Sequence, residues 1–98
     1  MKIARTPVFL MANLGAEVSR VASFHEKGDV ESAHKALIRA QGIIDEIKKF
    51  PEMQQRLPEM EILSVTINDI ISPQPVFSVS AMKLRDYFYP FALRLASL

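Results

Sequence analysis

The chain has 98 residues, of which 49% are hydrophobic, so it can bury one modest core and is not disordered. Twelve Lys and Arg residues against eleven Asp and Glu leave a formal charge of +1, with the basic residues scattered. A nucleic-acid-binding face would need clustered basic residues, so we do not expect nucleic acid as a partner. We expect a single helical domain over residues 1–98 with no disulfide, thiolate nucleophile or Cys-based zinc site, because cysteine is absent.

The first residues carry a weak targeting pattern. Lys2 and Arg5 precede a short apolar run at residues 8–12, which superficially resembles a secretion signal. Asn13 ends that run early, and the same residues have helical spacing, so we interpret them as an ordinary amphipathic helix. No stretch approaches the ~18 apolar residues of a membrane span. We predict a cytoplasmic protein with no membrane contact, a location that the lack of cysteine also favours.

After an N-terminal arm at residues 1–5, a first helix is predicted over residues 7–27. Thr6 is a suitable N-cap, and Pro7 suits the first turn. The opposite face of this helix is expected to be solvated and to carry a Glu17–Arg20 pair. Spacing of three and four places Met11, Leu14, Val18, Val21 and His25 on one seam, which Leu10, Ala22 and Phe24 widen.

The strongest helical pattern in the chain spans residues 29–50. Gly28 suits the end of the first helix and Asp29 the N-cap of the second, which predicts an antiparallel hairpin. Gly42 inside this helix costs ~1 kcal/mol relative to alanine, so we expect a neighbouring helix to cross closely there. A water-exposed face is predicted for the ladder of Glu31, Lys35 and Arg39. The apolar stripe comprises Val30, Ala33, Leu37, Ala40, Ile44 and Ile47.

Phe50-Pro51 ends this helix, and a connector at residues 51–57 leads to a third helix that begins at Pro58. Its predicted core residues are Met60, Leu63, Ile67 and Ile70, with Ile62 and Ile71 beside them. Because β-branched residues at 65–67 favour strands, a buried strand within residues 62–67 stays open as an alternative.

A proline-containing connector at residues 72–80 precedes a fourth helix, predicted from Ala81 to about Ala96 with Ser80 as N-cap. Pro90 should kink or end this helix. The residues expected to share its buried face are Leu84, Phe88, Phe91 and Leu95. The predicted fold is therefore an all-α, four-helix, mostly antiparallel bundle with a Pro-containing C-terminal helix.

One pair of residues has the spacing of a metal-binding motif. Glu31-x-x-His34 is the i,i+3 arrangement that carboxylate-bridged di-metal bundles use. Such sites need a second copy and two more glutamates, and the other histidine, His25, has no glutamate three residues before it. We therefore predict no metal site and no cofactor.

Arg20-Val-Ala-Ser-Phe-His25 matches a loose Arg-x4-His pattern. This pair resembles the motif of the HEPN ribonucleases, which are small dimeric helical bundles. In that family the arginine and histidine meet across the dimer to cleave RNA. The resemblance implies an alternative function, a dimeric metal-independent ribonuclease with Arg20 and His25 as catalytic residues. The competing interpretation of His25 is a partly buried histidine that is hydrogen-bonded to a backbone carbonyl.

The aromatic residues gather near the C-terminus, four of them in Tyr87-Phe-Tyr-Pro-Phe91. Consecutive helical residues point ~100° apart, so at least one tyrosine must reach the surface or another subunit. We predict a protein-interaction surface here, whereas the alternative is a bulky cap over the bundle end. Its candidate residues are Met82, Arg85, Tyr87 and Tyr89.

Residues Glu26 to Glu46, EKGDVESAHKALIRAQGIIDE, are similar to the central helical hairpin of the flagellar secretion chaperones. The resemblance implies a helical bundle that wraps an extended flagellin tail and blocks its premature assembly. The whole chain resembles small helical bacterial proteins whose roles are not established. The leading hypothesis is a non-enzymatic interaction, adaptor or chaperone-like protein that binds itself as a homodimer, or another protein.

Overall fold

The computed structural model describes residues 6–72, 84 and 86–90. The regular elements among these residues are all helical: α1 (Pro7–Glu26), α2 (Val30–Lys48), the short 3-10 helix η1 (Pro51–Arg56) and α3 (Leu57–Asp69). Residues 84 and 86–90 are also helical and are named the C-terminal segment below. The predicted all-α class is confirmed, and the strand alternative at residues 62–67 is wrong because α3 covers them.

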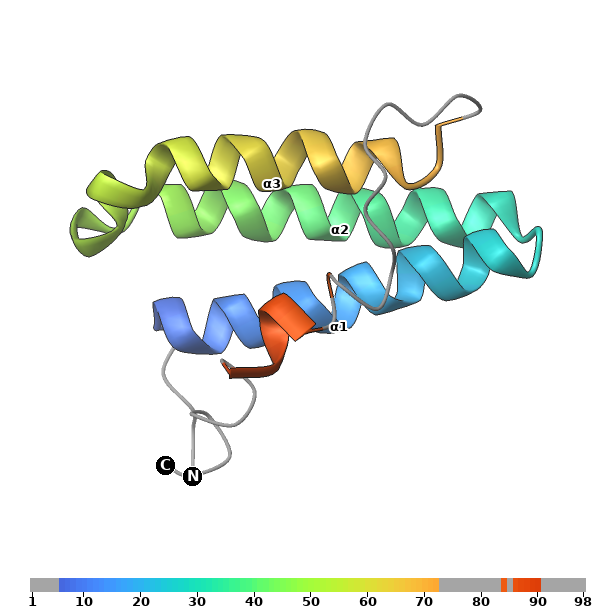
Figure 1. Ribbon diagram of the computed structural model, residues 1–98, viewed down its shortest axis with the longest axis horizontal. Coiled ribbons are helices and arrows are strands. Elements are labelled where there is room, and N and C mark those ends of the chain that lie inside the picture. The colour runs from blue at the N-terminus through green and yellow to red at the C-terminus, as the bar shows by residue number, and fades with distance from the viewer. Residues whose placement is uncertain (1–5, 73–83, 85, 91–98) are drawn as a thin grey trace.

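Local capping explains where α1 and α2 begin and end. The Thr6 hydroxyl accepts a hydrogen bond from the Phe9 N–H at 3.2 Å, and Pro7 opens the helix. Gly28 has a φ of +76°, the left-handed conformation that glycine adopts without strain. The Asp29 carboxylate then accepts from the Ser32 N–H at 3.1 Å and starts α2. These caps produce the antiparallel hairpin that the sequence predicts (Figure 1).

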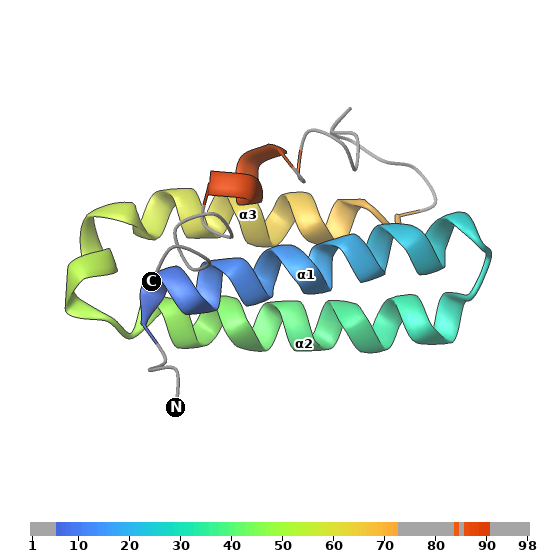
Figure 2. The same cartoon turned by 90° about the horizontal axis from the view of Figure 1, so that it is seen from below.

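α1 packs most extensively on α2, and α2 lies against α3. Two perpendicular views show that the three helices run in alternating directions (Figures 1 and 2). The core runs through every one of these elements and into the C-terminal segment. Its buried side chains are Leu10, Met11, Leu14, Val18, Ala40, Ile44, Ile47, Met53, Met60, Leu63, Ile67, Leu84 and Phe88.

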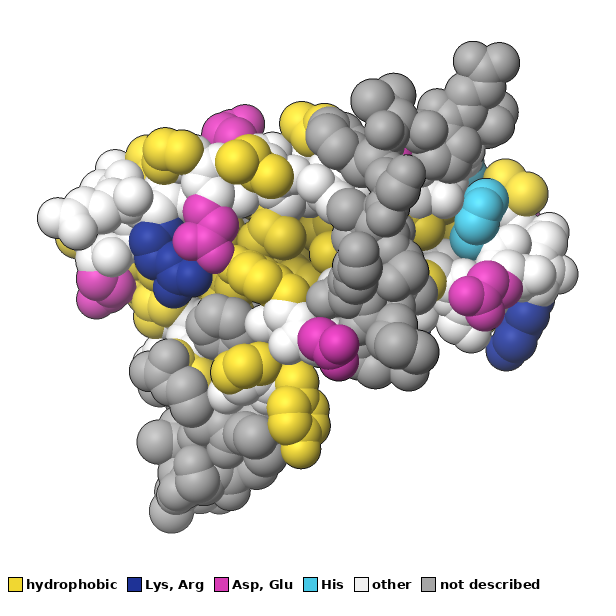
Figure 3. All heavy atoms as spheres, viewed as in Figure 1, with side chains coloured by type: hydrophobic (Ala, Val, Ile, Leu, Met, Phe, Trp, Pro, Cys, Tyr) yellow, Lys and Arg dark blue, Asp and Glu magenta, His cyan; other side chains and the backbone are white. Residues whose placement is uncertain are grey.

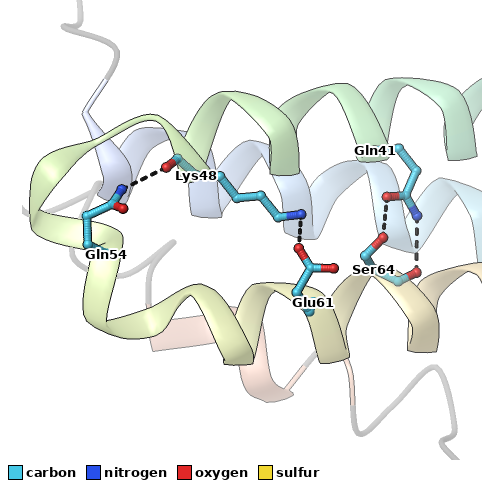
Figure 4. A network of polar contacts seen from close by, with 5 residues as sticks. All are labelled: Gln41, Lys48, Gln54, Glu61 and Ser64. Carbon is cyan, nitrogen blue, oxygen red and sulfur yellow. Dashed lines mark hydrogen bonds and ion pairs between the residues drawn. The ribbon is translucent and has the colours of Figure 1, made fainter.

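Polar side chains attach α3 to α2 along the solvent edge of their contact (Figure 4). The Ser64 hydroxyl donates to Gln41 Oε1 at 2.7 Å, and Gln41 Nε2 donates to the Ser64 carbonyl at 3.1 Å. Nearer the η1 turn, Lys48 forms an ion pair with Glu61. These contacts supplement the apolar packing and fix the register between the two helices.

Three positions that the sequence predicts to be buried or closely packed are exposed. Val30 is 63% exposed, because it is the first residue of α2 and no neighbouring element covers it. His25 is exposed in the last turn of α1 and is not part of the seam. Gly42 is exposed, and a Cβ added there would meet no atom within 4 Å, so none of the described helices crosses closely at that position.

Only part of the predicted fourth helix lies within the described residues. Leu84 and Phe88 are buried as expected, and Pro90 is the last described residue of the segment. Phe91, Leu95 and Ser80 lie outside the described residues, as do the arm at 1–5 and the connector after Ser72. Within the described part of the chain, every helix is too short or too polar to traverse a lipid bilayer.

Candidate functional site

The C-terminal segment contacts both α1 and α3, and the close approach to α1 occurs at Gly15. A Cβ built on Gly15 would lie 2.7 Å from Phe88 Cβ and 2.9 Å from Phe88 Cγ. These distances are too short for real atoms, so the absence of a side chain at Gly15 is what allows the Phe88 ring to reach the core. The sequence placed the close approach at the wrong glycine, because spacing alone does not distinguish Gly15 from Gly42.

A three-residue polar cluster holds the same segment to α3. The Arg56 guanidinium donates two hydrogen bonds to the Glu59 carboxylate, each 2.9 Å long, in a bidentate arrangement. The Tyr87 hydroxyl donates to Oε1 of the same carboxylate. The hydrogen bonds from Arg56 lower the pKa of Glu59, and the Tyr87 bond adds to this effect against the opposing effect of burial. Glu59 is therefore charged at neutral pH and accepts from both partners.

The three consecutive aromatic residues of the C-terminal segment have different surroundings. Tyr87 is half-buried beside Glu59, Phe88 is buried, and Tyr89 is 61% exposed. The Tyr87 and Phe88 rings meet edge to face, with centroids 5.0 Å apart. One tyrosine therefore reaches the surface, as the ~100° rotation per residue requires. Of the four predicted interaction residues, Tyr87 and Tyr89 are described, while Met82 and Arg85 lie outside the described residues.

Hydrophobic side chains gather between α3 and α1 on the face that also bears the C-terminal segment (Figure 3). On α3, Ile62 and Val65 are 66% and 52% exposed. Ile62 follows Glu59 by three residues, so the two side chains are neighbours on the helix surface. Exposed apolar side chains therefore adjoin the cluster that anchors Tyr87.

The predicted ribonuclease pair lies on the exposed side of α1. Arg20 donates through Nη1 to Glu17 Oε1 at 2.6 Å, and His25 is exposed. His25 follows Arg20 by five positions, which places their side chains roughly 140° apart around α1. The two are not brought together within one chain, and catalysis across a dimer stays a prediction.

The predicted pair of Glu17 with Arg20 is confirmed, but the prediction that Glu17 lies on a solvated face is wrong, because Glu17 is buried against α2. Its side chain is only 9% exposed, and it accepts from Arg39 Nε of α2 at 2.5 Å as well as from Arg20. Burial raises the pKa of Glu17, but the hydrogen bonds from Arg39 and Arg20 outweigh it and lower the pKa below its usual 4.5. The signal was present in the spacing, since Glu17 follows Leu14 by three residues and precedes Val21 by four, within the apolar seam.

Glu31 and His34, the candidate metal motif, are both exposed on α2. Glu31 forms an ion pair with Lys35 at 3.2 Å. Among the described residues, no group of three or more His, Cys, Asp or Glu side chains is arranged to hold a metal ion.

The structure thus defines an all-α protein whose helical hairpin is covered by a third helix and by the C-terminal segment. Comparisons with protein-family models, curated proteins and solved structures find no match to this chain.

Proposed function

We propose that this chain is a non-enzymatic protein–protein interaction protein, an adaptor or chaperone-like bundle, which self-associates through the face carrying the C-terminal segment. The observation that carries the proposal is the exposure of Tyr89, 61%, on a segment whose other aromatic residues are fixed. Tyr87 is held by Glu59, and Phe88 is buried against Gly15. A tyrosine on a fixed segment offers a large contact area and loses little conformational freedom on binding.

The neighbouring surface supports the same proposal. Ile62 adds exposed apolar area beside the anchoring Glu59, and Val65 extends this area by one turn along α3. Hydrophobic side chains are visible between α3 and α1 in Figure 3. A contact surface of this kind combines an aromatic anchor with an apolar surround and charged groups at its edge. Arg56 and Glu59 supply the charged groups.

We also propose an architecture for the complete chain and a location in the cell. We infer that the complete chain is a four-helix, mostly antiparallel bundle in which Pro90 interrupts the fourth helix. The burial of Leu84 and Phe88 in the shared core supports a fourth helix. The lack of cysteine supports action in the reducing cytoplasm.

The test is the mass of the purified protein by light scattering after gel filtration, across a hundredfold range of concentration. We expect a dimer at the upper end of the range that dissociates on dilution. Tyr89→Ala should raise the dissociation constant at least about tenfold, since truncating an aromatic anchor typically costs more than about 1 kcal/mol. Tyr87 is unsuitable for this purpose, because its loss would also detach the segment from α3.

Ile38→Ala is the matched control. Ile38 is 71% exposed, but it lies on α2 and has no role in the proposed surface. Its substitution should leave the dissociation constant unchanged. A wild-type protein that is monomeric at every concentration would contradict self-association. Equal effects of Tyr89→Ala and Ile38→Ala would show that the surface has been placed wrongly.

A further inference from the structure

The α1–α2 hairpin holds two arginines against one buried carboxylate. Arg20 Nη1 lies 2.6 Å from Glu17 Oε1, and Arg39 Nε lies 2.5 Å from Glu17 Oε2. The glutamate side chain is 9% exposed, whereas the two arginine side chains are 54% and 51% exposed. One buried carboxylate therefore positions two guanidinium groups at the surface.

Most of the hydrogen-bonding capacity of these arginines is not used by Glu17. A guanidinium group has five N–H donors, and each arginine donates through a single nitrogen to the carboxylate. Within the described residues neither arginine has another hydrogen-bond partner. The three charges sum to +1, so the cluster attracts an anion and offers it several donors.

The geometry of the cluster limits the size of that anion. Because both donor nitrogens contact one carboxylate, the two guanidinium groups lie within about 7 Å of each other, a span that one tetrahedral oxyanion can bridge by hydrogen bonds. The adjacent surface is also open. Ala16, four residues before Arg20, is exposed, and so is Gly42, three residues after Arg39. No atom lies within 4 Å of a Cβ added to Gly42.

We propose that Arg20 and Arg39, positioned by Glu17, bind a single phosphate group, either free phosphate or the phosphate of a small phosphomonoester. Arginine suits this ligand because its planar donors match phosphate oxygens, and fixing the side chains beforehand reduces the entropy lost on binding. One arginine pair on a chain of scattered charge fits one phosphate and not a nucleic acid strand. The site lies on α1 and α2 and is separate from the proposed self-association surface.

The test is a nuclear magnetic resonance titration of the labelled protein, with inorganic phosphate and with adenosine monophosphate, at constant ionic strength. We expect saturable shifts at residues of the α1–α2 contact, with millimolar affinity or better. Arg39→Gln should weaken binding at least about tenfold. Equal affinities would identify free phosphate as sufficient, and tighter binding of adenosine monophosphate would identify a phosphomonoester; either supports the proposal.

Lys48→Gln is the matched control, because Lys48 is also a cation paired with a glutamate, Glu61, but it follows Arg39 by nine residues on α2 and belongs neither to the phosphate site nor to the self-association surface. It should leave phosphate affinity unchanged. Thermal unfolding checks that each variant is folded, and Arg20→Gln replaces Arg39→Gln if the latter is not.

Three results would overturn the proposal. The first is the absence of saturation up to about 20 mM phosphate, and the second is equal phosphate affinity in the Arg39 and Lys48 variants. The third is binding of an RNA oligonucleotide without binding of phosphate. None of them bears on the mass measurement, so failure of this site and failure of self-association are distinguishable.

Discussion

Gly15 and Gly42 both lie inside helices, but only Gly15 is in a crowded environment. An added Cβ would overlap the Cβ and Cγ atoms of Phe88 at Gly15 and would meet nothing within 4 Å at Gly42. We expect Gly42→Ala to raise the free energy of unfolding by up to about 1 kcal/mol, through helix propensity. Gly15→Ala should lower the free energy of unfolding by about 1–3 kcal/mol, since the Phe88 backbone must shift. Urea unfolding measures both changes.

The opposite signs are the informative outcome, because helix propensity favours alanine equally at both positions. A stabilisation of similar size in both variants would mean that Phe88 does not approach α1 at Gly15. In a Phe88→Gly background, which lacks both overlapping atoms, the cost of Gly15→Ala should disappear, and a double-mutant cycle detects this change.

Because of Glu17, the free energy of unfolding should depend on pH in the acid range. Its pKa is lowered below 4.5, so its contribution is complete above that pH and is lost as the pH falls through the lowered value. Glu17→Gln should reduce the free energy of unfolding at pH 7 by about 1–2 kcal/mol, because a charged acceptor of two hydrogen bonds is lost. The difference between wild type and variant should shrink by pH 2. A difference independent of pH would contradict the ion-pair assignment.

At the scale of an element, Tyr87 is the polar attachment of the C-terminal segment to α3. Tyr87→Phe keeps the ring and removes only the hydroxyl that donates to Glu59. We expect a loss of about 1–2 kcal/mol, the usual range for a hydrogen bond to a charged group at a partly exposed site. Amide hydrogen exchange of residues 86–89 should accelerate more than exchange within α2.

Measurements at alkaline pH provide a control for the hydrogen bond between Tyr87 and Glu59. Burial raises the pKa of Tyr87, and the hydrogen bond to Glu59 raises it further, so the neutral phenol is the form that the fold favours. Its contribution is complete below the usual pKa of 10.0 and is lost as the pH rises through the raised value. The difference between wild type and Tyr87→Phe should therefore diminish above pH 10. An unchanged exchange rate in the variant at neutral pH would mean that Tyr87 does not anchor the segment.

The helices themselves could be predicted because their signals are local. Thr6, Gly28 and Asp29 act on residues within one turn, and each cap is found where the sequence predicts it. Burial at helix ends could not be predicted in this way. Val30 and His25 fit the apolar period, but the period says nothing about whether a neighbouring element extends that far.

At the scale of the molecule, the buried side chains form one cluster that includes α1, α2, η1, α3 and the C-terminal segment. We expect one cooperative unfolding transition, and Ile44→Ala, at a fully buried position, should lower the free energy of unfolding by about 2–4 kcal/mol. Ile38→Ala removes the same atoms from a 71% exposed side chain and should change the free energy of unfolding by less than about 0.5 kcal/mol. Circular dichroism and tyrosine fluorescence should report coincident transitions; two separate transitions would contradict a single core.

The candidate site could be predicted less well than the fold, because it depends on contacts between distant parts of the chain. The rotation between adjacent helical residues was enough to predict that a tyrosine is exposed. Which tyrosine is exposed depends on Glu59, and the surroundings of Glu17 depend on Arg39, which follows it by 22 residues. Helical spacing contains no information about such pairings.

The contact between Gly15 and Phe88 also constrains the order of events during synthesis. The two residues are far apart in the sequence, whereas the α1–α2 hairpin is closed by a short turn at Gly28. Since local contacts form before distant ones, the hairpin can assemble on the ribosome while the surface around Gly15 is still uncovered. The nascent chain therefore presents the surface of α1 around Gly15 until Phe88 emerges, and in that interval this surface is accessible to a chaperone or to a neighbouring nascent chain.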